Sequence, residues 1–324
     1  MRLAMPNRAY LADIERFLRN RKDDGSPDLT FDLAQGFFSV HPLVLCTIAA
    51  MAAHTRRNGG DVVLLNDKLA PSIRYLERMK LFDVIGCESV CSVQEHDPAG
   101  RFIPVTRITT GKELTDFLTD FIPLLHAGPE ESMTIRYVLA ELVRNTLEHS
   151  GPPSEAFVAA QVIKTDNRLA VAVADSGIGI RESITRYHVA ANDREAIVKS
   201  FEPGISGATG TFGGNENNGG AGLFFMKAMA TMARCHMVTV TGDSAMKLRR
   251  TPIGPVKVQP SLLDDKVYWR DAIPPYQGTA VGIDIKVSPD IKFNDLLSEI
   301  RKVYGIRIRE QKTSKRRARF VKTH

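Results

Sequence analysis

Residues 141–150 read ELVRNTLEHS and end a segment with strong helical periodicity. The apolar positions recur at helical spacing and predict a helix over 132–149. Glu141, Asn145 and His149 are each four residues apart, so such a helix carries them on one face, away from the leucines and valines. This stripe of carboxylate, amide and imidazole fits a solvated face as well as a binding site. Its meaning depends on the motifs that follow.

A second motif, DSGIGI, follows a predicted β-hairpin. The β-rich runs 157–163 and 169–174 are joined by an Asp-Asn turn, and Asp175 comes directly after the second run. A carboxylate at a strand end can accept a hydrogen bond from an exocyclic amine of a ligand. Gly177 and Gly179 would let a flat ring approach the backbone. DxGxG alone has low specificity, because glycine turns after strands are common.

A third motif is rich in glycine and opens into an apolar helix. Residues 202–222 hold eight of the 24 glycines and end in GGAG, and residues 223–233 have the pattern of a helix. Gly220, Gly222 and Leu223 stand at this junction. Exposed N–H groups and the helix dipole make such a junction a binding site for phosphate. A flexible linker before an ordinary helix fits the same residues.

In their order along the chain, these motifs resemble the GHKL ATPase family. ELVRNTLEHS, DSGIGI and the segment ending in GAGL are followed by Gly278-Thr279, which precedes an apolar strand predicted over 280–287. The family includes gyrase, MutL, histidine kinases and anti-sigma-factor kinases, and the motif style is closest to the last of these. The resemblance covers about 110–288. It implies the Bergerat ATP-binding fold of the α+β class, an α/β sandwich with a mixed sheet and helices on one face.

The resemblance also implies a role for each matching position. Asn145 would coordinate the Mg²⁺ that bridges the phosphates of ATP, and Glu141 would orient and deprotonate a water or a partner's hydroxyl. Asp175 would accept from the adenine amino group, with help from Thr279. Residues 202–219 would form a lid over bound ATP. The other positions implied to bind ATP are Gly177 and Gly179 at the adenine, and His149, Gly220, Gly222 and Leu223 at the phosphates.

The histidines upstream of the motifs differ from the phosphoacceptor of sensor kinases. In those kinases an acidic residue and a short Arg-Thr-Pro-like run follow the histidine. His41, His54 and His126 are followed by Pro-Leu, Thr-Arg-Arg and Ala-Gly. Autophosphorylation of the sensor-kinase type is therefore not expected.

Three regions are expected: a small α/β domain over 1–108, the ATP-binding domain over 109–290, and a basic helix or tail over 291–324. The elements expected in the first region are a helix from Pro42, a strand over 61–65 and a helix from Pro71. This pattern weakly resembles STAS domains, which partner anti-sigma-factor kinases. The phosphorylated turn of STAS domains has no counterpart in the VHPL segment, which lacks a hydroxyl. We therefore expect a docking or dimerisation module.

The net charge of +6 is unevenly distributed over the 324 residues. The last 24 residues hold ten Lys or Arg and one acidic residue, a net +9, so the other 300 residues sum to −3. The segment from Lys312 to Lys322 could neutralise phosphates of nucleic acid, with Phe320 stacking on a base. A solvated terminus fits the same composition and is the preferred interpretation.

The cysteines and apolar runs indicate the compartment. Four cysteines without a CxxC pair, and no apolar segment at the start of the chain, predict free thiols in a reducing compartment. Cys87 and Cys91 have a metal-like spacing but no second pair, so zinc is not expected. The longest apolar run, 42–53, is about half of what a bilayer requires. A cytoplasmic protein without membrane attachment is expected.

The function expected from these features is that of an ATPase or protein kinase with ATP and Mg²⁺ as cofactors, whose lid state controls a protein partner. A homodimer is compatible with the sequence. One alternative is a non-hydrolysing switch that uses ATP to order the lid and present a surface. Another is a nucleic-acid-linked ATPase that uses the basic tail.

Overall fold

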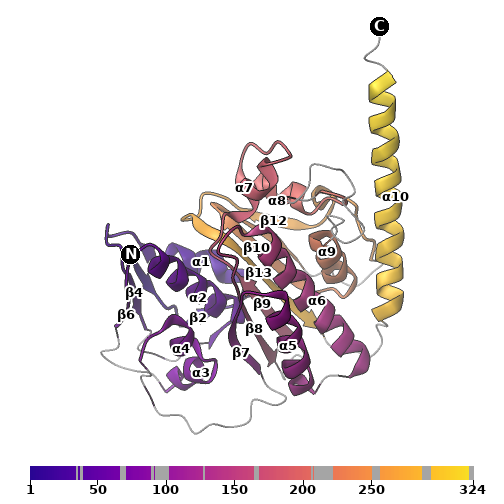
Figure 1. Ribbon diagram of the computed structural model, residues 1–324. Helices are drawn as coiled ribbons and strands as arrows, with labels where there is room; N and C mark the ends of the chain where they lie inside the picture. The colour runs from indigo at the N-terminus through magenta and orange to yellow at the C-terminus, as the bar shows by residue number, and fades with distance from the viewer. Residues whose placement is uncertain are drawn as a thin grey trace.

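The chain folds around one large antiparallel sheet, with a smaller sheet beside it (Figure 1). The computed structural model describes residues 1–33, 36, 39–65, 71–88, 91, 102–126, 128–163, 168–205, 207, 222–249, 256–286 and 293–320, with the side chains of the last helix up to residue 310 and at residue 313.

The large sheet has seven strands in the order β12-β11-β10-β13-β9-β8-β7, and every neighbouring pair is antiparallel. The predicted hairpin is present as β8 and β9, and the predicted late strand as β13. The strands are β7 (Phe102–Ile108), β8 (Ala156–Ile163), β9 (Arg168–Ala174), β10 (His236–Gly242), β11 (Ser244–Leu248), β12 (Val267–Arg270) and β13 (Tyr276–Lys286).

One face of this sheet is covered by helices from the second half of the chain. The helices α5, α6 and α9 pack over the sheet, and α7 and α8 lie at the end where β10 and β11 meet. Val171 and Val173 of β9 point into the core on this face, as the two-residue period of a strand requires. The helices are α5 (Gly111–Phe121), α6 (Pro129–His149), α7 (Gly179–Thr185), α8 (Asp193–Ser200) and α9 (Gly222–Met232), and a 3₁₀ turn (Pro123–Leu125) joins α5 to α6.

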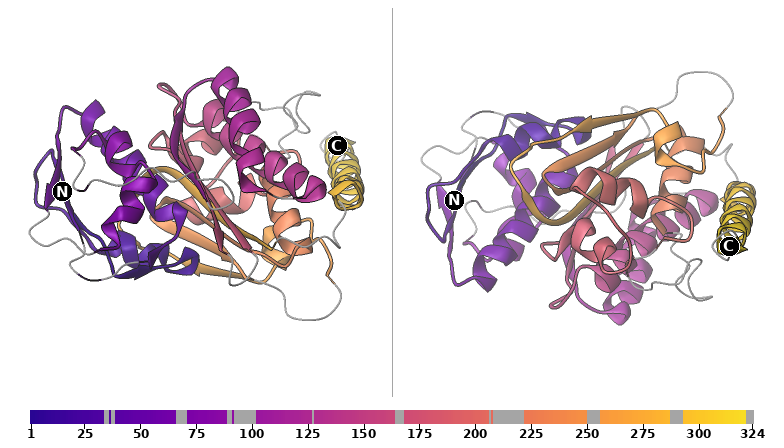
Figure 2. Two further views of the ribbon diagram at one scale, coloured as in Figure 1. Left: turned by 90° about the horizontal axis from the view of Figure 1, so that it is seen from below. Right: turned by 90° about the horizontal axis from the view of Figure 1, so that it is seen from above.

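The opposite face of the sheet is covered by α2 (Pro42–Arg57), from the N-terminal part of the chain. Figure 2 shows the sheet between this part and the layer of α5 and α6. Ala172 and Ala174 face α2, and their small side chains allow the helix to lie close to the strands. At Gly282 a Cβ atom would lie 3.0 Å from Cδ2 of Leu43, so the close approach of α2 also depends on that glycine.

The α/β sandwich that the family resemblance implies is confirmed, with two corrections. The sheet was expected to be mixed, but its pairings are all antiparallel. Helices were expected on one face, but α2 covers the second face because that face is also apolar. The strand β7, which the expected boundary at residue 108 assigns to the first domain, pairs with β8 at the edge of the large sheet.

The N-terminal part has its own sheet of four strands in the order β3-β1-β4-β6. The pairs β1–β4 and β4–β6 are parallel, and β1–β3 is antiparallel. Its resemblance to STAS domains stays a prediction. The remaining elements here are β1 (Arg2–Ala4), β2 (Arg8–Ala9), a 3₁₀ turn (Leu11–Asp13), α1 (Ile14–Arg19), β3 (Arg21–Lys22), β4 (Leu29–Asp32), β5 (Ser39–Val40), β6 (Val62–Leu65), α3 (Ile73–Arg78) and α4 (Leu81–Ile85).

The helix expected from Pro71 is divided into two short helices. Lys80 has a left-handed backbone conformation, with φ of 53°, which separates α3 from α4. The apolar side chains that predicted one helix, including Leu76 and Leu81, are buried all the same. Periodicity therefore identified the buried face and missed the break.

The chain ends in α10 (Phe293–Phe320), which packs against α9 and α6 through its first turns. Tyr304 lies with its ring centroid 6.0 Å from that of Phe224 and 5.7 Å from that of Phe225. The C-terminal part of α10 extends beyond the body of the chain (Figure 1). Within the described residues, no helix is long and apolar enough to cross a membrane.

Candidate functional site

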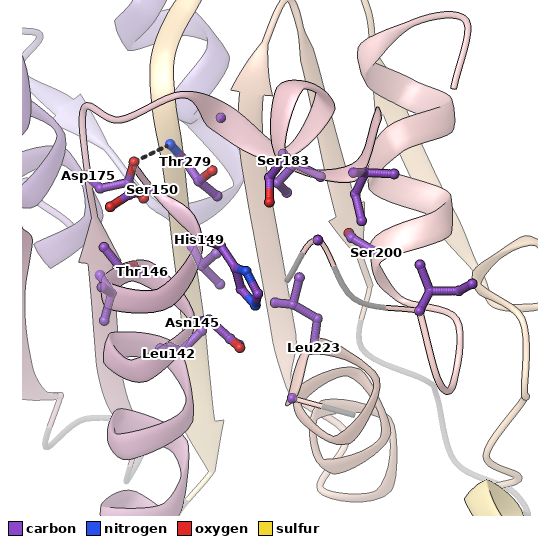
Figure 3. Close-up of a pocket in the computed structure, with 18 residues that line it drawn as sticks. Leu142, Asn145, Thr146, His149, Ser150, Asp175, Ser183, Ser200, Leu223 and Thr279 are labelled. Atoms are coloured by element: carbon purple, nitrogen blue, oxygen red, sulfur yellow. Dashed lines mark hydrogen bonds between the residues drawn. The ribbon is translucent and has the colours of Figure 1, made fainter. Parts of the chain in front are cut away.

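A pocket opens between α6, α7 and α9, above the strands β9 and β13 (Figure 3). It encloses about 750 Å³ of free space, including its open mouth. The residues lining it are Leu142, Asn145, Thr146, His149, Ser150, Val173, Asp175, Gly179, Ile180, Ser183, Ile184, Ser200, Ile205, Gly207, Gly222, Leu223, Thr279 and Val281. An apolar cleft with a few convergent polar groups is typical of a small-molecule site.

Asp175 is the most deeply buried acid of the pocket, with 3% of its surface exposed. Its Oδ1 accepts hydrogen bonds from the backbone amides of Gly177, at 2.9 Å, and Thr279, at 3.2 Å. No described residue donates a hydrogen bond to the other oxygen, Oδ2. Burial raises the pKa of Asp175 to about 7, against the opposing effect of the two backbone donors. The pocket thus contains a carboxyl group with one oxygen free to accept a hydrogen bond from a ligand.

Two glycines allow the chain to turn tightly around this carboxyl group. At Gly177, a Cβ atom would lie 2.1 Å from the carbonyl oxygen of Ser150, at the end of α6. Gly278 has a φ of 99°, and its Cβ would lie 2.3 Å from the carbonyl oxygen of Asp175. A side chain at either position would move the loop after β9 away from α6 or from β13. These glycines therefore hold three elements together around Asp175.

At the other end of the pocket, α6 meets the start of α9. A Cβ atom on Gly222 would lie 2.8 Å from Nδ2 and 2.9 Å from Oδ1 of Asn145, and 3.1 Å from Oε2 of Glu141. The Nδ2 of Asn145 is buried and has no hydrogen-bond partner among the described residues. A buried amide without a partner is costly, so such a group in a pocket points to a ligand that completes its hydrogen bonds.

Glu141 lies one turn before Asn145 and is 19% exposed at its side chain. Its Oε1 accepts a hydrogen bond of 2.7 Å from the guanidinium of Arg144. Burial raises the pKa of Glu141, and Arg144 opposes that effect. The carboxylate is thus more basic than an ordinary surface glutamate, which suits a group that accepts a proton.

His149 extends from α6 into the middle of the pocket, toward Leu223 (Figure 3). Burial and, to a smaller extent, the charge of Arg186 lower the pKa of His149. The ring is therefore neutral near pH 7 and can donate or accept a hydrogen bond. It adds little positive charge to the pocket.

The structure brings together most of the residues that the motifs selected. Those lining the pocket are Asn145, His149, Asp175, Gly179, Gly222, Leu223 and Thr279. Glu141 lies beside Asn145 and Gly222, and Gly177 donates to Asp175. Gly220 and most of the predicted lid, residues 206 and 208–219, lie outside the described residues.

Sequence reasoning missed the polar residues on the far side of the pocket. Ser183 on α7 and Ser200 at the end of α8 line it, and Thr146 lines it from α6 (Figure 3). Thr241 was also missed: its hydroxyl accepts from the amide of Ile180, at 3.1 Å, and donates to the carbonyl of Gly278, at 2.8 Å. Ser183, Ser200 and Thr241 stand singly in the sequence, outside any motif, so no spacing could have selected them. Thr146 lies within the first motif, but it is not one of the three polar residues spaced four apart.

The comparison with family models agrees with this geometry. Residues 130–252 match the family described as "Histidine kinase-, DNA gyrase B-, and HSP90-like ATPase". The chain thus contains an ATPase domain of the GHKL type, and the match supports binding of ATP by this domain. The matched segment runs from the start of α6 past β11 and contains Asn145, Asp175 and Gly222, whereas Thr279 and Val281 of the pocket lie beyond it on β13. A search of curated proteins found no match.

The residues at the α6–α9 end fit a bound Mg²⁺–nucleotide. The Oδ1 of Asn145 is an oxygen donor of the kind that Mg²⁺ prefers, and Mg²⁺ in nucleotide sites takes most of its ligands from phosphates and water. In the part of the chain that the structure describes, no cluster of three or more His, Cys, Asp or Glu residues could hold a metal. The amide oxygen of Asn145 therefore suits an ion that takes its other ligands from phosphates and water.

Proposed function

We propose that this protein binds ATP with Mg²⁺ in the pocket and either hydrolyses it or transfers its γ-phosphate to a protein partner. The observation that carries the proposal is the meeting of Asn145, Glu141 and Gly222 at the start of α9, where an unpartnered buried amide faces a helix N-terminus. Backbone N–H groups at a helix N-terminus bind phosphate.

The two ends of the pocket would bind the two ends of ATP. The free oxygen of Asp175 would accept a hydrogen bond from the adenine amino group, because Oδ1 is already held by Gly177 and Thr279. The apolar side chains of Ile180 and Val281 would pack against the base. At the other end Asn145 would hold Mg²⁺ and Gly222 would approach the phosphates. When bound, Mg²⁺ would supply positive charge to the phosphate oxygens.

Glu141 would accept the proton of the attacking group. Its pKa is raised by burial, so it is a better base than an exposed glutamate, and it lies one turn from Asn145. The attacking group would be water in an ATPase and a partner's hydroxyl in a kinase. The pocket geometry suits both reactions, since each needs the same base and the same bound phosphate.

A non-hydrolysing switch is a second candidate function. Arg144 binds Glu141 at 2.7 Å and reduces the basicity that burial confers, which favours a carboxylate held in place over one that moves a proton. In this function ATP would order the lid and expose a surface for a partner. Tight binding of ATP without product would support it.

Partners are part of the same proposal. A protein partner would bind through the N-terminal part or the lid, and the N-terminal part could also join two copies of the chain. Nucleic acid binding by Lys312 to Lys322 is a weaker option. If truncation after Tyr304 leaves DNA and RNA binding unchanged at low salt, that option fails.

An experiment with γ-labelled ATP, with the protein alone and with cell extract, separates these functions. Label on a protein indicates a kinase, and free labelled phosphate indicates an ATPase. Binding without either product indicates the switch. Absence of binding would contradict all three.

A further inference from the structure

The last residue of α2, Arg57, crosses from the N-terminal part to the loop that carries the acid of the pocket. Its Nη2 donates to the carbonyl oxygen of Ser176, at 3.0 Å, and to the Ser176 hydroxyl, at 2.6 Å. Ser176 is 5% exposed and stands directly after Asp175. A charged side chain from the opposite face of the sheet thus holds the peptide next to the pocket acid.

Arg57 is itself held in place by Glu155, just before β8. Its Nη1 forms an ion pair with Oε1 of Glu155, whose side chain is 5% exposed. The other oxygen of Glu155 accepts from Nε of Arg107 on β7, at 2.6 Å. Because the planar guanidinium spans a carboxylate on one side and a peptide on the other, its orientation is fixed by both.

This geometry constrains the carboxyl group of Asp175 through its own loop. The amide of Gly177 donates to Oδ1 of Asp175, and the Ser176 peptide that Arg57 holds links these two residues. We propose that Arg57 is a positioning residue of the pocket, which fixes the Ser176 peptide and thereby the orientation in which Asp175 accepts from the adenine base. The inference rests on the proposed function, because it takes adenine as the ligand.

A consequence is direct contact between the N-terminal part and the base-binding end of the pocket. A displacement of α2 along the sheet would move Arg57 and release the Ser176 peptide. A change in the position of Arg57 would therefore alter the affinity for nucleotide without any contact inside the pocket.

The charge of Arg57 gives the inference a second, independent readout. Burial raises the pKa of Asp175 to about 7, and the positive charge of Arg57 opposes this effect. The backbone amides of Gly177 and Thr279 also lower the pKa of Asp175, and the negative charge of Glu155 raises it. The Tyr276 hydroxyl faces the same residue and donates to its backbone carbonyl at 2.7 Å. Removing the Arg57 charge should therefore shift the pH dependence of nucleotide binding upward.

The test uses the full chain with three substitutions. Arg57→Gln removes the charge and keeps donor groups. Arg57→Lys keeps the charge, but its single ammonium group cannot donate to Glu155 and Ser176 at the same time. Arg107→Gln is the matched control, because it also removes a cation from Glu155 but does not contact Ser176. Affinity for ATP with Mg²⁺ is measured by calorimetry from pH 5.5 to 8.5, and thermal unfolding is recorded for each variant. The proton equilibria of ATP itself are the same for every variant, so differences between variants belong to the protein.

We expect Arg57→Gln to weaken ATP binding about tenfold and to raise the pH midpoint of binding by about 0.5 to 1. Arg57→Lys should lose affinity but keep a midpoint close to the wild-type value, and Arg107→Gln should change affinity less than twofold. If Arg57→Gln matches Arg107→Gln in both affinity and midpoint, the positioning role is wrong while the proposed function stands. If the wild-type chain does not bind ATP at all, the proposed function fails and the inference fails with it.

Discussion

The carboxylate of Asp175 accepts a hydrogen bond of 3.2 Å from the backbone amide of Thr279, although 104 residues separate the two. The bond forms where the end of β9 lies beside the start of the antiparallel strand β13. It keeps a buried acid pointing into the pocket. A carboxyl group held there for a ligand destabilises the free protein once it ionises, so function and stability are in conflict at this residue.

Asp175→Asn should stabilise the free protein at high pH. The pKa of Asp175 rises from 3.8 in the unfolded chain to about 7 in the folded protein. Relative to an ionised carboxylate, the protonated side chain therefore stabilises the fold fully below pH 3.8, and this stabilisation is lost as the pH rises to about 7. Asparagine is neutral and can still accept from both backbone amides. The variant should be more stable than wild type by on the order of 1–4 kcal/mol at pH 8 and nearly equal to it at pH 4, as measured by urea unfolding. A variant less stable than wild type at pH 8 would contradict the assigned ionisation.

The same substitution should weaken ATP binding. An ionised Asp175 accepts from the adenine amino group, whereas an asparagine must also present its own donor group there. We expect a loss of about 10- to 100-fold in affinity at pH 8. Wild-type affinity should fall below about pH 7 as Asp175 takes up a proton, and the affinity of the variant should change less over the same range. If the affinities of the two proteins change with pH in the same way, Asp175 does not accept a hydrogen bond from the bound nucleotide.

Gly222→Ala should reduce Mg²⁺-dependent affinity with little effect on folding. The added methyl group would lie 2.8 Å from Nδ2 of Asn145, so it would displace the amide from its place at the start of α9. A loss of affinity of about tenfold or more is expected from calorimetry. Gly305→Ala is the matched control, since it lies on α10 with no neighbour within 4 Å of its Cβ. That control should keep full affinity and gain about 0.5–1 kcal/mol of stability.

Glu141→Gln should abolish turnover without abolishing binding. If Glu141 accepts the proton of the attacking group, the turnover rate of the glutamine variant should fall about 10²–10⁴-fold, because general-base catalysis contributes this much. The measurement is release of phosphate from saturating ATP, with affinity recorded alongside. Glu148→Gln, on the exposed face of the same helix, is the control and should turn over at the wild-type rate. Equal rates of phosphate release for Glu141→Gln and wild type would contradict the role of Glu141 as the base.

Lys227→Met should destabilise the ATPase domain through α9. Lys227 is fully buried and pairs with Asp265 at 2.5 Å, and it also donates to the carbonyl of Gln259 at 2.7 Å. Removing the lysine leaves the acid buried without its partner, which costs about 3–5 kcal/mol. The double change Lys227→Met with Asp265→Leu should recover much of the loss, as measured by urea unfolding. A single variant as stable as wild type would contradict the role of this ion pair.

Long apolar periodicities made part of the fold predictable from the sequence. The helix predicted over 132–149 is α6, and the predicted hairpin is β8 and β9, because each presents a continuous apolar pattern that only one secondary structure satisfies. The predicted helix from Pro42 is α2. What each element packs against was not predictable in the same way. The pattern of α2 indicates that it is buried but does not say that its partner is a sheet more than 100 residues away.

The residues of the candidate site were likewise predictable only in part. Asp175 and Asn145 could be selected because motifs surround them. Arg57 and Lys227 could not, since a single basic residue at a helix end or within an apolar helix has many structural explanations. His41 is a similar case: it caps α2 by accepting from the amide of Leu43 and binds Asp284 with its other nitrogen, at 3.2 Å. The packing of α2 on the sheet brings Arg57 to Ser176 and His41 to Asp284. Lys227 on α9 meets Asp265 from the segment before β12.

The central claim is that the pocket binds ATP with Mg²⁺ through Asp175 and Asn145. The most direct measurement is a calorimetric titration of the full chain with ATP at pH 8, with and without Mg²⁺, repeated for Asp175→Asn and Asn145→Ala. The account predicts one saturable site in the wild type, weaker binding to Asp175→Asn under both conditions, and loss of the Mg²⁺ dependence in Asn145→Ala. No saturable binding by the wild type, or binding that neither substitution changes, would contradict it.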